Sequence, residues 1–183
     1  MLFFLAVALA DVPVQPVAAR MAALYDEICL KTFPIDTQVD ALMAAKGATV
    51  LTSDEVKATL RNDPGRGWRL QEGAITMLVF LEQPPFHACS IRAGIGSGQA
   101  DLTAYRAVVS AFKASHSGFK QEKPMDADVG PIRIHAEHEA RDLPGGGGES
   151  LMVIDQRVTD PARRARGETG TMLRYVHQFR TPG

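Results

Sequence analysis

Apolar residues recur every three to four positions in four segments of the chain, and this spacing predicts amphipathic helices. The predicted helices are 17–30, 37–46, 53–61 and 102–115. Two of them begin with the sequence of a capping box, in which a Ser or Thr is followed three residues later by an acidic residue. These pairs are Thr52 with Glu55 and Thr37 with Asp40. We therefore expect both threonines to cap helix starts.

Most other apolar residues lie in short runs rich in Ile, Val, Leu and Phe, which predict β-strands. The predicted strands are 67–71, 74–82, 86–92, 119–123, 132–140, 151–158 and 171–179. The strand over 132–140 alternates strictly, so its side chains divide between two faces. One face carries Ile132, Ile134, Ala136, His138 and Ala140, and the other carries Arg133, His135, Glu137, Glu139 and Arg141. We expect the first face to meet the core and the second to meet water.

The order of these elements predicts an α+β fold. Helices dominate the first third, and strands joined by short turns follow, which favours antiparallel pairing. We expect a mostly antiparallel sheet of about five to six strands, with N-terminal helices and one central helix packed on one face. The sequence has no internal repeat and no convincing domain boundary, so residues 11–183 are predicted to form a single domain.

The first ten residues have the pattern of an export signal. Residues 2–9 are an unbroken apolar run, and Ala8-Leu9-Ala10 has the form of a signal-peptidase site. The run is too short to cross a bilayer, which takes about 20 apolar residues. No Lys or Arg precedes it, so a start codon upstream of Met1 stays open. We expect 1–10 to be a signal peptide and the protein to be periplasmic or secreted. A buried N-terminal strand is the alternative.

The composition is that of a folded protein and restricts its partners. Of the 183 residues, 45% are hydrophobic and 22% are charged, and the formal net charge is −1. A chain without excess positive charge has no global attraction to nucleic acid or to an anionic membrane surface. No segment after the leader has the length and apolarity of a membrane span. We therefore expect no cofactor, no nucleic-acid partner and no membrane span.

Cys29 and Cys89 are the only cysteines of the chain. In an exported protein, a single pair of cysteines predicts one disulfide bond. Two free buried thiols are the alternative if the leader is not cleaved. The cysteines lack the short spacing of a zinc site, so we expect no metal.

The only cluster of catalytic residue types is the sequence HAEH at 135–138. Zinc deaminases contain an H-x-E pair, but they also need a downstream pair of cysteines, and none follows Cys89. On a strand, His135 and Glu137 share a face while His138 points away, so the three cannot hold a metal locally. Arg133, His135 and Glu137 therefore form a candidate polar face, and no residue is assigned a catalytic role.

Two further segments carry weaker signals. The glycine-rich segment 94–98 lies between a predicted strand and a predicted helix, but it lacks the full dinucleotide-binding pattern and is interpreted as a connector. The basic segment 163–166 is interpreted as a charged hairpin tip, with contact to an anionic partner as the alternative.

Three local patterns lie between residues 20 and 115. They are Tyr25-x₃-Cys29 in a helix, Gly67-Trp68 at the start of a strand, and the sequence HACS at 87–90 followed by Arg92. In these spacings the chain resembles small exported bacterial proteins of uncharacterised function. The resemblance implies an envelope location and a Cys29–Cys89 bridge, and it implies no catalytic residue.

Two functional hypotheses follow. The first is a non-enzymatic binding or interaction domain, stabilised by the disulfide, that takes a protein or small ligand of the cell envelope on a sheet face or in a helix–sheet groove. The second is a hydrolase that uses His135 and Glu137 as an acid/base pair. Convergence of these two residues with a third polar residue in a concave pocket favours the hydrolase. A flat or convex charged face favours the binding domain.

The leader gives a first testable prediction. After expression in a bacterial host, the mature protein should begin at Asp11 and fractionate with soluble envelope proteins, because cleavage is expected after Ala10. Intact-mass analysis of the envelope and cytosolic fractions measures this. A cytosolic product that retains Met1 would contradict it.

Overall fold

The computed structural model describes residues 16–84, 86–94, 101–165 and 170–178. Three predictions made above concern residues outside these ranges. They are the leader (1–10), most of the glycine-rich connector (95–98) and the end of the basic segment (166).

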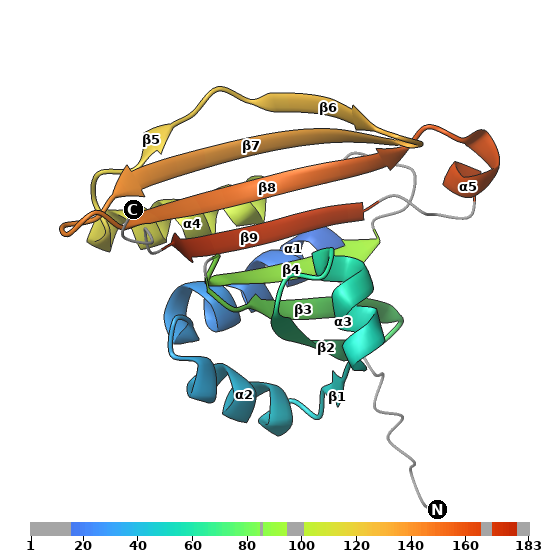
Figure 1. Cartoon of the computed structure of the whole chain (residues 1–183), viewed down its shortest axis with the longest axis horizontal. Helices are drawn as coiled ribbons and strands as arrows, with labels where there is room; N and C mark the ends of the chain where they lie inside the picture. The colour runs from blue at the N-terminus through green and yellow to red at the C-terminus, as the bar shows by residue number, and fades with distance from the viewer. Residues whose placement is uncertain (1–15, 85, 95–100, 166–169, 179–183) are drawn as a thin grey trace, which may run out of the picture.

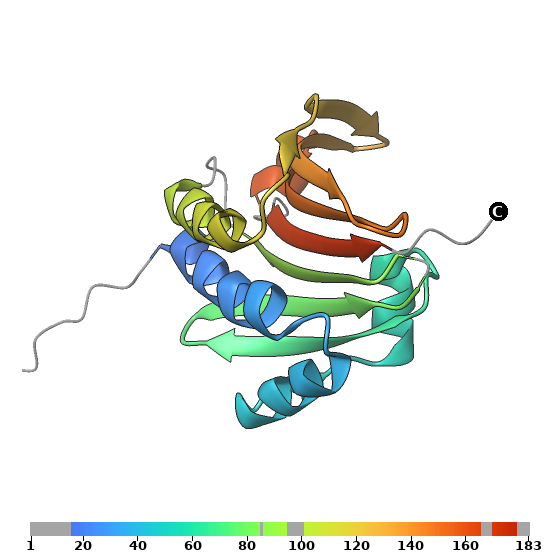
Figure 2. The same ribbon diagram turned by 90° about the vertical axis from the view of Figure 1, so that its left-hand side faces the viewer.

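The described residues form one antiparallel sheet with helices on both of its faces (Figures 1 and 2). The helices are α1 (Val17–Leu24), the π-helix η1 (Tyr25–Thr32), α2 (Asp36–Ala45), α3 (Ser53–Leu60), α4 (Thr103–Ser115) and α5 (Pro161–Ala165). The strands are β1 (Thr49–Val50), β2 (Gly65–Glu72), β3 (Ile75–Glu82), β4 (Ala88–Gly94), β5 (Lys120–Gln121), β6 (Met125–Val129), β7 (Ile132–Asp142), β8 (Gly148–Val158) and β9 (Gly170–Gln178). The α+β class and the antiparallel pairing are confirmed.

The sheet is larger than expected. It has nine described strands in place of the predicted five to six: all seven of the strand segments listed above belong to it, and β1 and β6, which were not foreseen, join them. The helix α5 fills a segment expected to be a turn. β6 was not predicted because Asp126 and Asp128 interrupt its apolar residues. Both aspartates lie at the exposed edge, where β6 pairs only with β7.

Two consecutive units with the same layout build the sheet. Each has a helical segment and, later in the chain, three consecutive antiparallel strands: α1–η1 with β2, β3 and β4, and α4 with β7, β8 and β9. The two inner strands, β4 and β9, pair along seven residues and join the units into one sheet. We call this β4–β9 pairing the seam. The architecture repeats although the sequence does not.

Both unit helices pack on the same face of the sheet, where they contact each other (Figure 2). The rings of Tyr25 and Tyr105 meet between them at 5.8 Å. Beneath the helices lies the main core, to which β3, β4, β8 and β9 contribute fully buried side chains such as Met77, Ile91 and Leu173. Burial of these side chains supplies most of the favourable free energy of folding.

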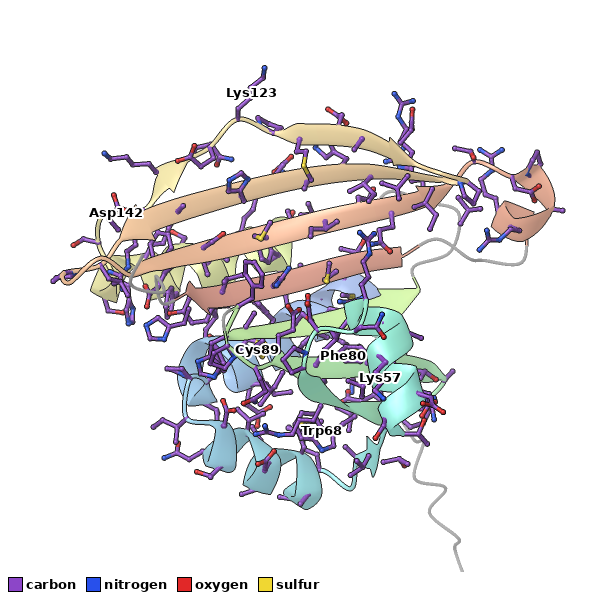
Figure 3. All side chains as sticks on the ribbon, viewed as in Figure 1. Lys57, Trp68, Phe80, Cys89, Lys123 and Asp142 are labelled. Atoms are coloured by element: carbon purple, nitrogen blue, oxygen red, sulfur yellow. A yellow bond between two sulfur atoms is a disulfide. The ribbon has the colours of Figure 1, made fainter. Side chains whose placement is uncertain are left out.

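The opposite face also carries a helix, contrary to the expectation that all helices share one face. There α3 covers Phe80 of β3 and buries Val56 and Leu60 against it (Figure 3). The backbone of β2 approaches closely at this point, since a Cβ on Gly67 would lie 2.7 Å from the Phe80 ring. A side chain at residue 67 would therefore force the two strands or the helix apart.

One of the two predicted capping boxes is confirmed. At α3, the Thr52 hydroxyl accepts a hydrogen bond from the Glu55 amide, and the Glu55 carboxylate accepts one from the Thr52 amide at 2.8 Å. The Thr37 prediction is wrong, because α2 begins one residue earlier without a side-chain cap. Asp40 instead forms an ion pair with Arg66 of β2, at 2.7 Å.

The alternation in β7 is confirmed, but its two faces are reversed. Glu137 pairs with Val153, a member of the core beneath the helices, so the charged row faces the helix-covered side. Ala136 pairs with Ile154 in a small apolar cluster on the opposite face. His138, expected in the core, lies with this second row and is only partly buried.

Cys29 of η1 and Cys89 of β4 form the predicted disulfide, with their Cα atoms 5.4 Å apart. Both residues are fully buried, and the bond fixes the first helical segment to the strand that forms one side of the seam. Among the described helices, none combines the length and apolarity needed to cross a membrane.

Reduction of this disulfide should lower the free energy of unfolding by up to about 4 kcal/mol, because the bond closes a loop of 60 residues in the unfolded chain. Urea unfolding with and without a reductant measures the loss. The double variant Cys29→Ala/Cys89→Ala should show no response to the reductant. An unchanged unfolding midpoint in the reduced wild type would contradict the prediction.

Candidate functional site

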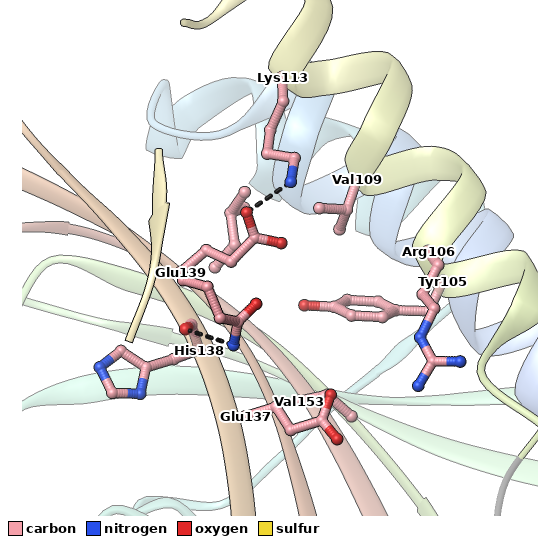
Figure 4. Close-up of a pocket in the computed structure, with 10 residues that line it drawn as sticks. Tyr105, Arg106, Val109, Lys113, Glu137, His138, Glu139 and Val153 are labelled. Atoms are coloured by element: carbon pink, nitrogen blue, oxygen red, sulfur yellow. Dashed lines mark hydrogen bonds and ion pairs between the residues drawn. The ribbon is translucent and has the colours of Figure 1, made fainter. Parts of the chain in front are cut away.

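A groove of about 280 Å³ lies between α4 and the outer strands β7 and β8, on the helix-covered face (Figure 4). We call it the α4–β7 groove. Its lining residues are Tyr105, Arg106, Val109, Lys113, Gln121, Glu137, His138, Glu139, Leu151 and Val153. The apolar members come from α4 and β8, and the two carboxylates come from β7. The groove is therefore a cleft with an apolar part and with charged groups on both walls, Arg106 and Lys113 on α4 and Glu137 and Glu139 on β7.

The two carboxylates of this wall have different surroundings. Glu139 accepts a hydrogen bond from Lys113 Nζ at 2.5 Å, which links β7 to α4 across one end of the groove. Glu137 has no partner on α4, and 41% of its side chain is exposed. The Glu137 carboxylate therefore offers a negative charge to the middle of the groove.

Tyr105 projects from α4 into the groove, with its hydroxyl toward the β7 wall (Figure 4). The side chain is buried, yet its hydroxyl forms no hydrogen bond with any residue in the described ranges. Burial, and the nearby charges of Glu139 and Glu137, raise the pKa of Tyr105 well above its ordinary value. The phenol therefore stays protonated and retains an unused hydrogen-bond donor.

Arg106 follows on the same helix and also lines the groove. Its guanidinium forms no ion pair or hydrogen bond with a residue of the described structure. An arginine has five N–H donors arranged as a planar fork, which suits a carboxylate or another oxyanion. Arg106 thus brings a positive charge without a partner among the described residues to the groove that the Glu137 carboxylate also lines.

The groove continues along β7 into a smaller pocket of about 40 Å³. Arg106, Glu137 and Val153 line both hollows, and the smaller one adds His135 and Asp155 among its lining residues. The predicted polar pair therefore lies at the end of the α4–β7 groove.

Arg133, the third residue of the predicted polar face, lies farther along β7. It lines an open hollow of about 320 Å³ together with Asp126, His135, Asp155 and Arg157. Arg133 is 66% exposed, and its nearest carboxylate is at 3.9 Å, on β6. The structure brings His135 and Glu137 together but leaves Arg133 at the solvent edge.

His135 lies between two carboxylates. Its Nδ1 is hydrogen-bonded to Asp126 Oδ1 at 3.0 Å, and its Nε2 is 3.6 Å from Glu137 Oε1. The hydrogen bond with Asp126 raises the pKa of His135, and Glu137 adds to this effect, while a small burial effect opposes it. The two carboxylates favour the imidazolium, which donates protons but does not accept them.

His135, Glu137 and Asp155 converge in one concave pocket, which is the arrangement expected of an acid/base site. The hydroxyl that also lines this pocket, Thr171 Oγ1, donates to Asp155 Oδ1 at 3.0 Å. No Ser, Thr or Cys side chain of the described residues is hydrogen-bonded to His135. A nucleophile activated by this histidine is therefore not assembled here.

The two units differ at the positions that form the groove. On the outer strand of the first unit, Trp68 and Leu70 face the helices and are buried. On the outer strand of the second unit, Glu137 and Glu139 occupy the corresponding helix-facing positions. The first unit shows that this architecture accommodates apolar side chains there. The carboxylates of the second unit open a cleft that apolar residues would have closed.

Sequence reasoning missed Tyr105 and Arg106, the α4 side of the site. Tyr105 is one of the apolar positions that predict the helix over 102–115, and no sequence motif marks Arg106. Their connection to β7 depends on a contact between segments about 30 residues apart, and no local pattern encodes it. Among the described residues, no cluster of three or more His, Cys, Asp or Glu side chains has the arrangement of a metal site.

Comparison with protein-family models, with curated proteins and with solved structures gives no significant match in any of the three.

The environment of His135 predicts a pH effect. A histidine whose pKa is raised on folding stabilises the protein below its unfolded value of 6.5, and the contribution disappears as pH rises through the folded value. In Asp126→Asn, the pKa of His135 measured by NMR should fall toward 6.5. The stability difference from wild type should be present at acidic pH and vanish above neutrality.

Asp128→Asn is the matched control, because it removes the same charge from the same strand while Asp128 pairs with Arg133. It should shift the pKa of His135 much less than Asp126→Asn does. Equal shifts in the two variants would mean that His135 responds to net charge and not to the bond with Asp126.

Proposed function

We propose that this protein is an exported, non-enzymatic binding protein whose α4–β7 groove takes a small zwitterion, such as an amino acid or a short peptide. The observation that carries the proposal is the set of polar groups that both walls of the groove present to a ligand. On α4 these are the Tyr105 hydroxyl and the Arg106 guanidinium, which have no partner among the described residues, and on β7 the Glu137 carboxylate, which lies 3.6 Å from His135 at the end of the groove.

The chemistry of each group points to part of the ligand. Arg106 suits a carboxylate, which it binds through two parallel N–H donors. Glu137 suits an ammonium group, and Tyr105 can donate one further hydrogen bond. Val109, Leu151 and Val153 supply apolar contacts for the body of the ligand. A volume of about 280 Å³ lies just below the usual range for ligand pockets, which suits a small ligand.

The charges along the groove also support a site that binds a ligand. Lys113 and Glu139, at one end of the groove, compensate each other in an ion pair. Arg106 is exposed and has no partner among the described residues, and the Glu137 carboxylate lies 3.6 Å from His135 Nε2. A zwitterion placed between Arg106 and Glu137 would add a counter-charge to each.

Export remains part of the proposal. It is supported by the leader pattern of residues 1–10 and by the buried Cys29–Cys89 disulfide, since such bonds persist in oxidising compartments. The resemblance to small exported bacterial proteins points to the same location.

A second candidate function is acid/base catalysis by His135 and Glu137, which the convergence with Asp155 in one pocket favours. We rank it below binding for two reasons. The imidazole lies between two carboxylates that favour its protonated form, and no hydroxyl or thiol of the described residues is hydrogen-bonded to it.

The proposal is tested by titrating the mature, oxidised protein with a panel of free amino acids and dipeptides, followed by NMR. Residues of α4, β7 and β8 should shift together and saturate. Arg106→Gln should weaken binding roughly tenfold or more, because it removes a charge-assisted hydrogen bond. Tyr105→Phe should weaken it about fivefold, the equivalent of one neutral hydrogen bond of about 1 kcal/mol.

Tyr25→Phe is the matched control. The Tyr25 hydroxyl is buried in the core without a hydrogen-bond partner, so its removal should change neither binding nor folding. Equal affinities for wild type, Tyr105→Phe and Arg106→Gln would exclude the α4–β7 groove. Turnover of a dipeptide that depends on His135 would favour the catalytic candidate.

A further inference from the structure

A second polar cluster lies on the opposite face of the sheet, across the seam. It consists of Glu82 on β3, Ser90 and Arg92 on β4, and Arg174 on β9, which we call the seam cluster. Ser90 pairs directly with Arg174 across the seam, and Arg92 is two residues farther along β4 on the same face. Such diagonal neighbours lie about 7–8 Å apart, within the reach of two arginine side chains.

Only one of the two arginines has a carboxylate partner. Arg174 donates to Glu82 Oε2 at 2.6 Å, and both members of this ion pair are largely buried. Burial raises the pKa of Glu82, and Asp63 adds to the effect, while Arg174 and Arg92 oppose it. The cluster therefore has one carboxylate engaged by Arg174.

Arg92 has no such partner. Its guanidinium lies over the Phe80 ring, with Cζ 5.0 Å from the ring centroid, and its buried Nε has no hydrogen-bond acceptor. Burial lowers the pKa of Arg92 to about 10, helped by Arg174 and Arg61 and opposed by Glu82. Arg92 is thus partly buried, and no carboxylate of the described residues forms an ion pair with it.

Two further donors in the cluster are also unused. The Ser90 hydroxyl is buried without a hydrogen-bond partner, and so is Nε of Arg174. Buried polar atoms in native proteins nearly always have a partner, either protein, water or ligand. Three buried donors without acceptors lie close together on adjacent strands, and a single bound acceptor group could satisfy them.

The charge balance indicates which acceptor fits. The charged groups that act electrostatically on Glu82 and Arg92, with these two residues themselves, are Arg61, Arg92 and Arg174 on the positive side and Asp63 and Glu82 on the negative side. One positive charge is in excess. Guanidinium groups and a hydroxyl together form the typical donor set for a phosphate, sulfate or carboxylate group.

We propose that the seam cluster is a binding site for a small oxyanion, held by Arg92, Arg174 and Ser90. The site is separate from the α4–β7 groove, because the sheet lies between them. A bound anion would complete the hydrogen bonding of all three residues. It would also join β4 to β9, so that ligand binding would stabilise the seam itself.

The experiment is thermal unfolding of the mature, oxidised protein in inorganic phosphate, in acetate and in chloride at matched ionic strength. A ligand that binds only the folded state raises Tm, by roughly 5–10 °C at a hundredfold excess over its Kd. We expect phosphate or acetate to raise Tm above the chloride value. Phosphate alone would indicate a tetrahedral anion, and both would indicate a general oxyanion site.

Arg92→Met should abolish the anion-dependent rise. In chloride it should melt at or above the wild-type temperature, because an unpaired cation has been replaced by an apolar side chain. Lys57→Met is the control for net charge, since Lys57 is exposed on α3 (Figure 3), and it should keep the full rise. If Arg92→Met does not fold, Ser90→Ala provides the test: it should weaken the anion affinity about fivefold without lowering Tm in chloride.

Two results would overturn the proposal. One is a wild-type Tm that phosphate and acetate leave at its chloride value. The other is a rise that persists undiminished in Arg92→Met or in Ser90→Ala, because the anion would then act elsewhere on the protein.

Discussion

The pairing of β4 with β9 is the interaction on which the rest of the structure depends. Seven residue pairs join strands about 80 positions apart and turn two three-stranded meanders into one sheet. Only then do α1–η1 and α4 share a face and bury Tyr25 of η1 against Tyr105 of α4. At one end of the seam, Gly94 pairs with Gly170, where a Cβ on Gly170 would lie 2.8 Å from the Ala93 carbonyl oxygen. The disulfide fixes η1 to the β4 side of the same pairing.

At both candidate sites, polar side chains stand at sheet positions where apolar side chains would pack more favourably. In the first unit, Trp68 and Leu70 fill the space between helix and outer strand, whereas the second unit has carboxylates there and a groove results. On the opposite face, Arg92 and Arg174 occupy strand positions that an apolar pair would fill at lower energetic cost. Polar groups that lower the stability of a fold are expected mainly at its functional sites.

Local physical chemistry was sufficient to predict much of the fold. The period of 3.6 located the main helices, the period of two located β7, and Thr52 with Glu55 marked the start of α3. The orientation of β7 could not be predicted, because a strand with one apolar and one charged row does not reveal which row a helix will cover. The sequence pointed to His135 and Glu137 but not to Tyr105 or to Arg92 with Arg174, since their partners are fixed only by contacts between distant segments.

Native-state amide hydrogen exchange of the oxidised protein tests the role of the seam most directly. If the β4–β9 pairing holds the two units in one cooperative structure, the hydrogen-bonded amides of both strands should exchange only through global unfolding, with equal free energies of opening. The free energies of opening of the amides in both strands should also fall by the same amount for each addition of denaturant. The account is contradicted if the amides of β9 exchange through a lower-energy opening while those of β4 stay protected, because the second unit would then unfold independently of the first.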